Sequence, residues 1–331
     1  MEQVWLKSYP AGVPAEIDPD SYPSVAAMLE EVLHRHADRD AVVCLGKVLR
    51  YGDLDRLSAQ FAAWLQSLSL PRGSRVALMM PNCHAYVVAL IGVMRAGMTA
   101  VNVNPLYTPR ELEHQLKDSG AELLLVMENF AHTVEKALPQ TLVRQVVLVS
   151  MGDLLGPLKG RVTNFVVRRV KKMVPPFRLP GAIRFAEVLA QGAKRPFRKP
   201  EVLPSDLAVL QYTGGTTGVP KGVMLTQRNI VANVLQDQAW FHPSMEQPGR
   251  PRPEGPPVFV VALPLYHIYA FMVCLLLGLH LGGKLILIPN PRDVDAVVKA
   301  LRPHRPVVFP GLSTLYNLLM EHEGFRKLDF S

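Results

Sequence analysis

One eleven-residue stretch constrains the fold of this chain more than any other feature. Residues 212–222 hold four glycines, three threonines and one lysine, and they directly follow an apolar run at 207–210 that predicts a buried strand. Glycines let the backbone turn successive N–H groups toward an anion, while threonine hydroxyls and a lysine ammonium add donors and charge. The sequence therefore predicts a phosphate-binding loop. Its residues are Tyr212, Thr213, Gly214, Gly215, Thr216, Thr217, Gly218, Val219, Pro220, Lys221 and Gly222.

This stretch is not a Walker A loop. That motif needs a glycine directly before the lysine and Ser or Thr after it, whereas Pro220 precedes Lys221 here and Gly222 follows it. The P-loop fold is therefore disfavoured. A glycine pair alone is most often a turn and a lone lysine a solvated charge, so the prediction depends on the whole combination.

Apolar runs and amphipathic segments alternate along most of the chain. Two short runs around Gly46 predict a hairpin, and Ser24 and Thr108 are predicted to cap helices. Strands are expected near 76–80, 99–103, 122–127, 146–150, 207–210, 223–225, 259–263, 284–288 and 307–309. This order predicts an α/β fold of layered sheets with flanking helices.

Composition narrows the class of protein. At 331 residues and 49% apolar, the chain can form two domains or one large subdivided domain. Charged residues interrupt the first 23 positions, so no secretory signal is predicted. Cys44, Cys83 and Cys274 are expected to be buried thiols of a cytosolic protein. Residues 258–283 are the most membrane-like, but Pro264 and His267 are among the residues that interrupt them, so a strand and a buried helix are predicted there.

The net charge of +8 is concentrated in one segment. Residues 159–200 contain twelve basic side chains and one acidic side chain, Glu187. A helical wheel of residues 161–174 separates an apolar arc from a basic one, which suits an anionic membrane surface. The alternative is a helix packed on the protein with a solvated basic face. Nucleic acid is not expected as a partner, because interleaved aromatic residues are missing.

A second candidate site follows the strand predicted at 259–263. Pro264-Leu265-Tyr266-His267 places a histidine at the carboxyl end of that strand, where α/β sheets bind ligands. Taken alone, His267 is more often a core histidine or a helix cap. The apolar residues that follow, Phe271 among them, fit either a core or the wall of a lipid channel.

The two sites together resemble one enzyme superfamily. Residues 212–222 resemble the Thr/Gly-rich nucleotide loop of the adenylate-forming enzymes, and their opening residues resemble the bacterial long-chain fatty-acid–CoA ligases in particular. Residues 102–116 also resemble those ligases. The segment ending at His267 is similar to the motif with which fatty-acid and aryl–CoA synthetases place a histidine beside the acyl carboxylate.

The resemblance implies a two-step reaction. A fatty acid carboxylate attacks the α-phosphorus of ATP to give acyl-AMP and pyrophosphate, and the thiol of coenzyme A then displaces AMP. Residues 213–218 would cradle the phosphates, and the expected catalytic residues are Lys221, which adds charge, Tyr212, which supports the loop, and His267, which positions the carboxylate. Phe271 would gate an acyl tunnel, and a plain core role is its other interpretation.

The resemblance also implies that the chain is the N-terminal portion of such a ligase. The Mg²⁺ ligand and a mobile C-terminal domain are expected beyond residue 331, and no metal ligand is assigned within the chain. Residues 1–200, with the basic segment 151–200, are expected to form a first α/β subdomain, and residues 201–331 an incomplete second one. The chain alone is expected to be inactive, cytoplasmic and peripheral on the inner membrane.

Two other functions stay open at this point. A medium-chain or aryl–CoA ligase would share the same motifs, because the dimensions of a tunnel set the preferred acyl length. A non-catalytic fragment that binds lipid or nucleotide would also share them. Turnover distinguishes an enzyme from a binder, and a series of acids distinguishes the ligases.

Overall fold

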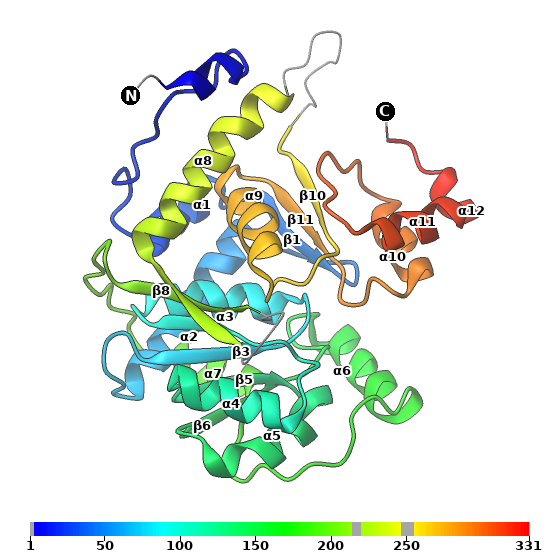
Figure 1. Cartoon of the computed structure of the whole chain (residues 1–331). Coiled ribbons are helices and arrows are strands. Elements are labelled where there is room, and N and C mark those ends of the chain that lie inside the picture. The colour runs from blue at the N-terminus through cyan, green and yellow to red at the C-terminus, as the bar shows by residue number, and fades with distance from the viewer. Residues whose placement is uncertain (1–2, 214–219, 246–254, 331) are drawn as a thin grey trace.

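The computed structural model describes residues 3–213, 220–245 and 255–330 (Figure 1). Its strands form one sheet of seven strands and one of four. In Figure 1 the smaller sheet, with β1, β10 and β11, lies above the larger one, with β3, β5 and β6. Helices flank both sheets, so the predicted layered α/β fold is confirmed.

The larger sheet has the order β7-β6-β5-β3-β4-β8-β9. All neighbours are parallel except β8 and β9, which form an antiparallel hairpin. Parallel strands covered on both faces appear in sequence as continuous apolar runs, which is why most of these strands could be predicted. The two-residue strand β7 was not predicted. The strands are β3 (Arg75–Met79), β4 (Thr99–Asn102), β5 (Leu123–Met127), β6 (Gln145–Val149), β7 (Ile183–Arg184), β8 (Leu207–Thr213) and β9 (Lys221–Thr226).

The smaller sheet has the order β10-β11-β1-β2. The predicted hairpin around Gly46 is confirmed as β1 (Asp40–Cys44) and β2 (Lys47–Arg50), and β1 lies parallel to β11 (Lys284–Leu287), which pairs with β10 (Val258–Val261). The strand predicted at 307–309 is wrong, because only an isolated bridge joins Val308 to Phe259. Prolines at 306 and 310 enclose this segment, and a proline cannot donate to a ladder.

Both predicted helix caps are confirmed. The Ser24 hydroxyl accepts a hydrogen bond from the Ala27 amide, and Thr108 forms a capping box with Glu111. No helix among the described residues is both long and apolar enough to span a membrane. The α-helices are α1 (Val25–Arg35), α2 (Tyr51–Ser67), α3 (His84–Arg95), α4 (Pro109–Ser119), α5 (Ala131–Ala137), α6 (Pro157–Phe165), α7 (Phe185–Gly192), α8 (Gln227–Met245), α9 (Leu277–His280), α10 (Val294–Leu301), α11 (Ser313–Glu321) and α12 (Glu323–Arg326).

Five shorter helical segments complete the fold. Three are 3-10 turns and two are π-helical turns that continue or precede an α-helix. The 3-10 turns are η1 (Val4–Ser8), η2 (Glu128–Phe130) and η3 (Leu138–Gln140), and the π-helical turns are η4 (Val166–Val170) and η5 (Ala270–Leu276).

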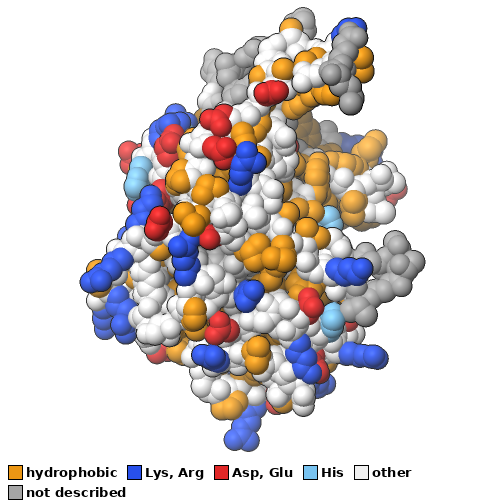
Figure 2. All heavy atoms as spheres, turned by 60° about the vertical axis from the view of Figure 1, so that its left-hand side comes forward, with side chains coloured by type: hydrophobic (Ala, Val, Ile, Leu, Met, Phe, Trp, Pro, Cys, Tyr) orange, Lys and Arg blue, Asp and Glu red, His pale blue; other side chains and the backbone are white. Residues whose placement is uncertain are grey.

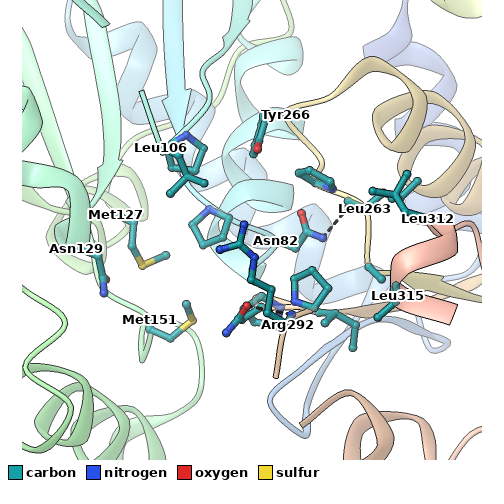
Figure 3. A pocket seen from close by; sticks show the side chains of 18 of the residues that line it. Asn82, Leu106, Met127, Asn129, Met151, Leu263, Tyr266, Arg292, Leu312 and Leu315 are labelled. Carbon is teal, nitrogen blue, oxygen red and sulfur yellow. Dashed lines mark hydrogen bonds between the residues drawn. The ribbon is translucent and has the colours of Figure 1, made fainter. Parts of the chain in front are cut away.

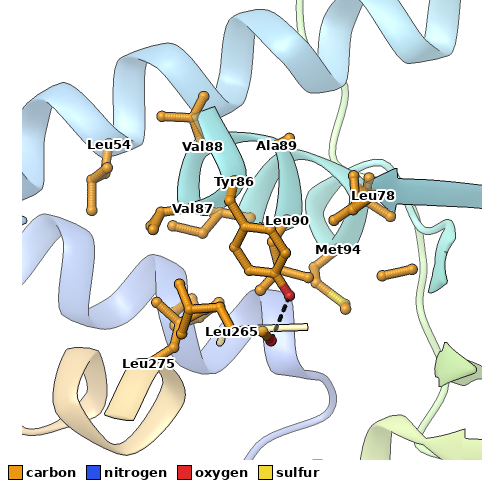
Figure 4. Packing of buried hydrophobic residues seen from close by; sticks show 14 of the residues in the cluster. Leu54, Leu78, Tyr86, Val87, Val88, Ala89, Leu90, Met94, Leu265 and Leu275 are labelled. Carbon is orange, nitrogen blue, oxygen red and sulfur yellow. Dashed lines mark hydrogen bonds between the residues drawn. The ribbon is translucent and has the colours of Figure 1, made fainter. Parts of the chain in front are cut away.

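Helix α3 is the centre of the core. All its residues are buried, and Figure 4 shows its Tyr86 and Val87 packed between Leu54 of α2 and Leu275 of η5. Full burial of one such side chain contributes about 1.5–3 kcal/mol. The helix therefore joins the elements of both sheets into one core. The three cysteines are buried and free, as predicted.

The strands of the two sheets are interleaved along the sequence. β1 comes early in the chain yet pairs with β11, and β8 comes after residue 200 yet pairs with β4. The division predicted at residue 200 therefore does not coincide with a boundary between sheets. A sequence pattern reveals strands but not their partners, which explains the difference.

Candidate active site

The β8–β9 hairpin carries the described part of the predicted phosphate loop. Thr213 and Lys221 are directly opposite each other in the antiparallel register, and both are exposed. Residues 214–219, which include Gly214, Gly215, Thr216, Thr217, Gly218 and Val219, lie outside the described residues. Lys221 has no ion pair with any described residue, so a hydroxyl and an ammonium are both accessible to an anion at the end of this hairpin.

Tyr212 supports the hairpin from the side. Its hydroxyl donates a hydrogen bond to Asp118 of α4, and its ring covers Gly222, where an added Cβ would lie 2.9 Å from the ring. Burial raises the pKa of the Tyr212 phenol, and the Asp118 carboxylate raises this pKa further. On the same helix, His114 Nε2 lies 3.4 Å from the Pro220 carbonyl oxygen. Helix α4 thus contacts β8 and the residue that precedes β9.

His267 lies in the tight turn that follows β10. The His267 amide donates to the Pro264 carbonyl at 2.9 Å, and the Phe271 amide donates to the His267 carbonyl at 3.0 Å. The imidazole is exposed, and its Nδ1 accepts a hydrogen bond from the Tyr269 amide at 3.4 Å. An acceptor role for Nδ1 leaves Nε2 as the N–H donor that can bind a carboxylate.

Phe271 lies elsewhere in the same segment. It is fully buried in the main core cluster and does not line the cavity described below. This location fits the plain core interpretation, and the gate role stays a prediction.

A set of buried amide side chains was missed in the sequence. Gln211 of β8 donates through Nε2 to the carbonyl oxygen of Tyr266 at 2.9 Å and accepts through Oε1 from Asn102 at 3.0 Å. Asn82 holds the backbone of the same turn, because its amide bonds the Leu263 carbonyl at 2.9 Å and the Leu265 N–H at 2.8 Å. Polar residues inside apolar strands were the available signal.

A cavity of about 580 Å³ lies beside Tyr266 (Figure 3). Its lining comes from the carboxyl ends of strands in both sheets, which is where α/β folds bind ligands. Most of the lining is apolar, and Arg292 is exposed at its edge. The residues labelled in Figure 3 are Asn82, Leu106, Met127, Asn129, Met151, Leu263, Tyr266, Arg292, Leu312 and Leu315.

The described residues do not fit a metal site. They contain no group of three or more His, Cys, Asp or Glu side chains that could hold an ion. No step of the proposed chemistry is therefore derived through Mg²⁺.

A family comparison identifies the class of protein to which this geometry belongs. Residues 29–331 match the model of the AMP-binding enzyme family. The chain belongs to that family.

Relatives and solved structures extend the comparison. This AMP-binding enzyme is 52% identical over 332 residues to a long-chain-fatty-acid–CoA ligase of Yersinia pestis, with all of the chain and 58% of the relative covered. The structure of an anthranilate CoA ligase in complex with anthranoyl-AMP matches with a TM-score of 0.75 at 20% identity, over 95% of this chain and 55% of that one. A long-chain-fatty-acid–CoA ligase of Archaeoglobus fulgidus matches with a TM-score of 0.72 at 23% identity, over 95% and 57%.

The resemblance recognised in the sequence is thus confirmed. The chain spans 58% of the length of the Yersinia pestis relative, as expected for an N-terminal portion of such a ligase. The two structural matches support the fold.

Proposed function

We propose that the chain supplies the nucleotide-binding and acyl-binding parts of a ligase that converts long-chain fatty acids to acyl-AMP and then to acyl-CoA. One observation carries the proposal. The Gln211 side chain bonds the Tyr266 carbonyl, so β8, which pairs with the strand of Lys221, is joined to the turn of His267. Activation of an acid requires this combination of a phosphate-binding cation and a carboxylate-binding donor.

Each residue of the site has a proposed role. Lys221 and Thr213 would bind phosphate oxygens of ATP, where negative charge accumulates as pyrophosphate leaves. His267 would donate through Nε2 to one carboxylate oxygen and direct the other toward the α-phosphorus. Tyr212 would support the loop by holding β8 against α4. The cavity beside Tyr266 would hold apolar carbon atoms of the acid.

The long-chain acid is favoured over the alternatives. A 4-coumarate–CoA ligase of Arabidopsis thaliana is 27% identical over 86% of the chain, compared with 52% over the whole chain for the Yersinia pestis long-chain ligase. The mostly apolar lining of the cavity also suits an alkyl chain. Coenzyme A is the proposed second substrate.

The test uses the chain completed by the part of the Yersinia pestis ligase that the match leaves uncovered, called the completed chain below. Lys221→Ala and His267→Ala should each reduce ATP–pyrophosphate exchange with oleate by about a hundredfold. Lys327→Ala, which removes an exposed lysine near residue 331, is the matched control and should keep full exchange. Normal exchange in Lys221→Ala would contradict the phosphate role.

We also propose that the basic segment binds an anionic membrane surface. The apolar side chains of α6 and η4 face solvent, since Val162, Phe165 and Val170 are 55%, 62% and 64% exposed. This exposure favours the membrane surface over the packed-helix alternative. Arg168, from the basic arc, pairs instead with the buried Glu128 at 2.7 Å.

The contact that anchors α6 leaves the apolar side chains of α6 and η4 exposed to solvent. An added Cβ at Gly160 would lie 2.5 Å from the Gly152 carbonyl oxygen, so the helix rests on that loop by its glycine face. Met173, which is 52% exposed just beyond η4, also lines the cavity. The apolar surface and the cavity are therefore adjacent at Met173. By contrast, the face in Figure 2 carries dispersed basic side chains with acidic ones among them.

A further inference from the structure

A continuous path of buried polar side chains crosses the molecule between the two candidate sites. Gln211, two residues before Thr213, donates a hydrogen bond to the carbonyl of Tyr266, which directly precedes His267. Asn102 of the neighbouring strand β4 donates to Gln211 and accepts from the Tyr86 hydroxyl at 2.7 Å. The path thus connects β8, β4 and α3 with the turn of His267.

The turn is bound from a second side by α3 and the residues before it. The Tyr86 hydroxyl also lies 2.9 Å from the Leu265 carbonyl oxygen, as the dashed line in Figure 4 shows. Asn82 bonds three backbone groups, the carbonyls of Val261 and Leu263 and the N–H of Leu265. Side chains from two other elements therefore satisfy the backbone of the turn.

These side chains are almost completely buried. Gln211 is 6% exposed, Asn102 is 3% exposed and Tyr86 is fully buried. A buried polar group without a partner costs about 1–3 kcal/mol, and amide pairs strengthen each other in a low-dielectric interior. An apolar residue at position 211 would fill a buried strand without this cost. The amides therefore require an explanation beyond packing.

We propose that Gln211 and Asn102 are positioning residues that set the separation between Lys221 and His267. Gln211 uses both ends of its amide, one toward Asn102 and one toward Tyr266. Any shift of β8 along its axis would break one of these bonds, so the position of the hairpin and the position of the histidine are coupled. This inference depends on the proposed function, because it assigns the pair to the step in which carboxylate and ATP react.

Two substitutions separate positioning from simple stability. Gln211→Met keeps the approximate size of the side chain and loses both hydrogen bonds. Gln211→Glu keeps the acceptor for Asn102 but sets a second oxygen against the Tyr266 carbonyl. Burial raises the pKa of a carboxyl group, and the protonated form again donates to that carbonyl. Low pH should therefore rescue Gln211→Glu alone.

The experiment measures ATP–pyrophosphate exchange with oleate in the completed chain. Gln211→Met should lower kcat by about a hundredfold, because a misplacement of about 1 Å has an effect of that size, while KM for ATP and for oleate change little. Relative to the parent, Gln211→Glu should recover as the pH falls from about 8 to about 6, whereas Gln211→Met should not. Gln227→Met, which removes a buried amide that accepts from the Val25 N–H, is the control and should keep kcat.

Each outcome decides the assignment. Unfolding free energies of the 331-residue chain should fall in both Gln211→Met and Gln227→Met, with kcat lost only in the former. If both variants lose kcat equally, Gln211 has only a structural role and the proposal is overturned. The same conclusion follows if low pH fails to rescue Gln211→Glu. Absence of exchange in the parent completed chain would overturn the proposed function and this assignment with it.

Discussion

The hydroxyl of Tyr212 on β8 donates a hydrogen bond to the carboxylate of Asp118 at the end of α4. The same tyrosine ring covers Gly222 on β9, where no larger residue would fit without displacement of the ring. One side chain therefore ties the hairpin that carries Lys221 to a helix whose first turn is fixed by a capping box.

Loss of this hydrogen bond should weaken the hairpin. Tyr212→Phe keeps the ring over Gly222 and removes only the hydroxyl, so the unfolding free energy should fall by about 1 kcal/mol, since the Asp118 carboxylate stays hydrated. Urea unfolding of the 331-residue chain measures this change. Tyr9→Phe, whose ring packs on Trp240, is the control. An unchanged midpoint in Tyr212→Phe would show that the bond contributes nothing.

A smaller cavity should discriminate against long acids. Leu106 and Leu312 line the cavity and are 68% and 64% exposed, so tryptophan at either position narrows the space without disturbing the core. Leu106→Trp and Leu312→Trp should weaken oleate binding by about tenfold, or about 1.4 kcal/mol, and octanoate binding less. Calorimetric titration of the chain measures both acids. Leu142→Trp, away from the cavity, serves as the control, and equal effects on the two acids would place the alkyl chain elsewhere.

Charges on the exposed apolar surface should prevent binding to vesicles. Burial of one Val or Phe side chain is worth about 1.5–3 kcal/mol, so Val162→Asp with Phe165→Asp should reduce binding to phosphatidylglycerol vesicles by more than about tenfold. Cosedimentation with the 331-residue chain is the measurement. Phosphatidylcholine vesicles should bind the parent more weakly, and Leu142→Asp should bind like the parent. Undiminished binding of the double variant would exclude this surface.

A buried histidine should make stability depend on pH. His84 is 2% exposed, its Nε2 atom has no hydrogen-bond partner among the described residues, and burial lowers its pKa to about 4. The unfolded chain takes up this proton near pH 6.5, so the folded state loses stability as the pH falls from about 6.5 to about 4, by about 3 kcal/mol in total.

The variant His84→Gln isolates this effect. As the pH falls across the same interval, the unfolding free energy of His84→Gln minus that of the parent should increase by that amount. If the unfolding free energies of His84→Gln and the parent change in parallel with pH, His84 is not the source of this pH dependence.

Much of the fold could be predicted because its signals are local. Apolar runs revealed the parallel strands, and a capping box revealed the start of α4. The pairing of β1 with β11 could not be predicted, because strands far apart in sequence carry no mark of their partner. The exposed apolar side of α6 was also hidden, because the helical wheel shows two arcs but not the inward turn of Arg168 toward Glu128.

The chemical groups of the candidate site were predicted from the sequence, whereas the buried amides that hold the turn of His267 in place were not. Lys221, Thr213 and His267 carry groups that can bind anions. Thr213 ends β8, Lys221 begins β9, and His267 lies in the turn that follows β10. Gln211 was not predicted, because its role depends on a carbonyl group 55 residues away in the sequence. Phe271 was assigned to a gate or to the core, and it lies in the core cluster.

The most direct test of the central claim is ATP–pyrophosphate exchange by the completed chain with oleate, octanoate or 4-coumarate as the acid, beside the 331-residue chain alone. The proposed function predicts exchange that depends on the acid, is greatest with oleate and is lost in Lys221→Ala. Exchange with 4-coumarate in preference to oleate, or no exchange with any acid in the completed chain, would contradict it.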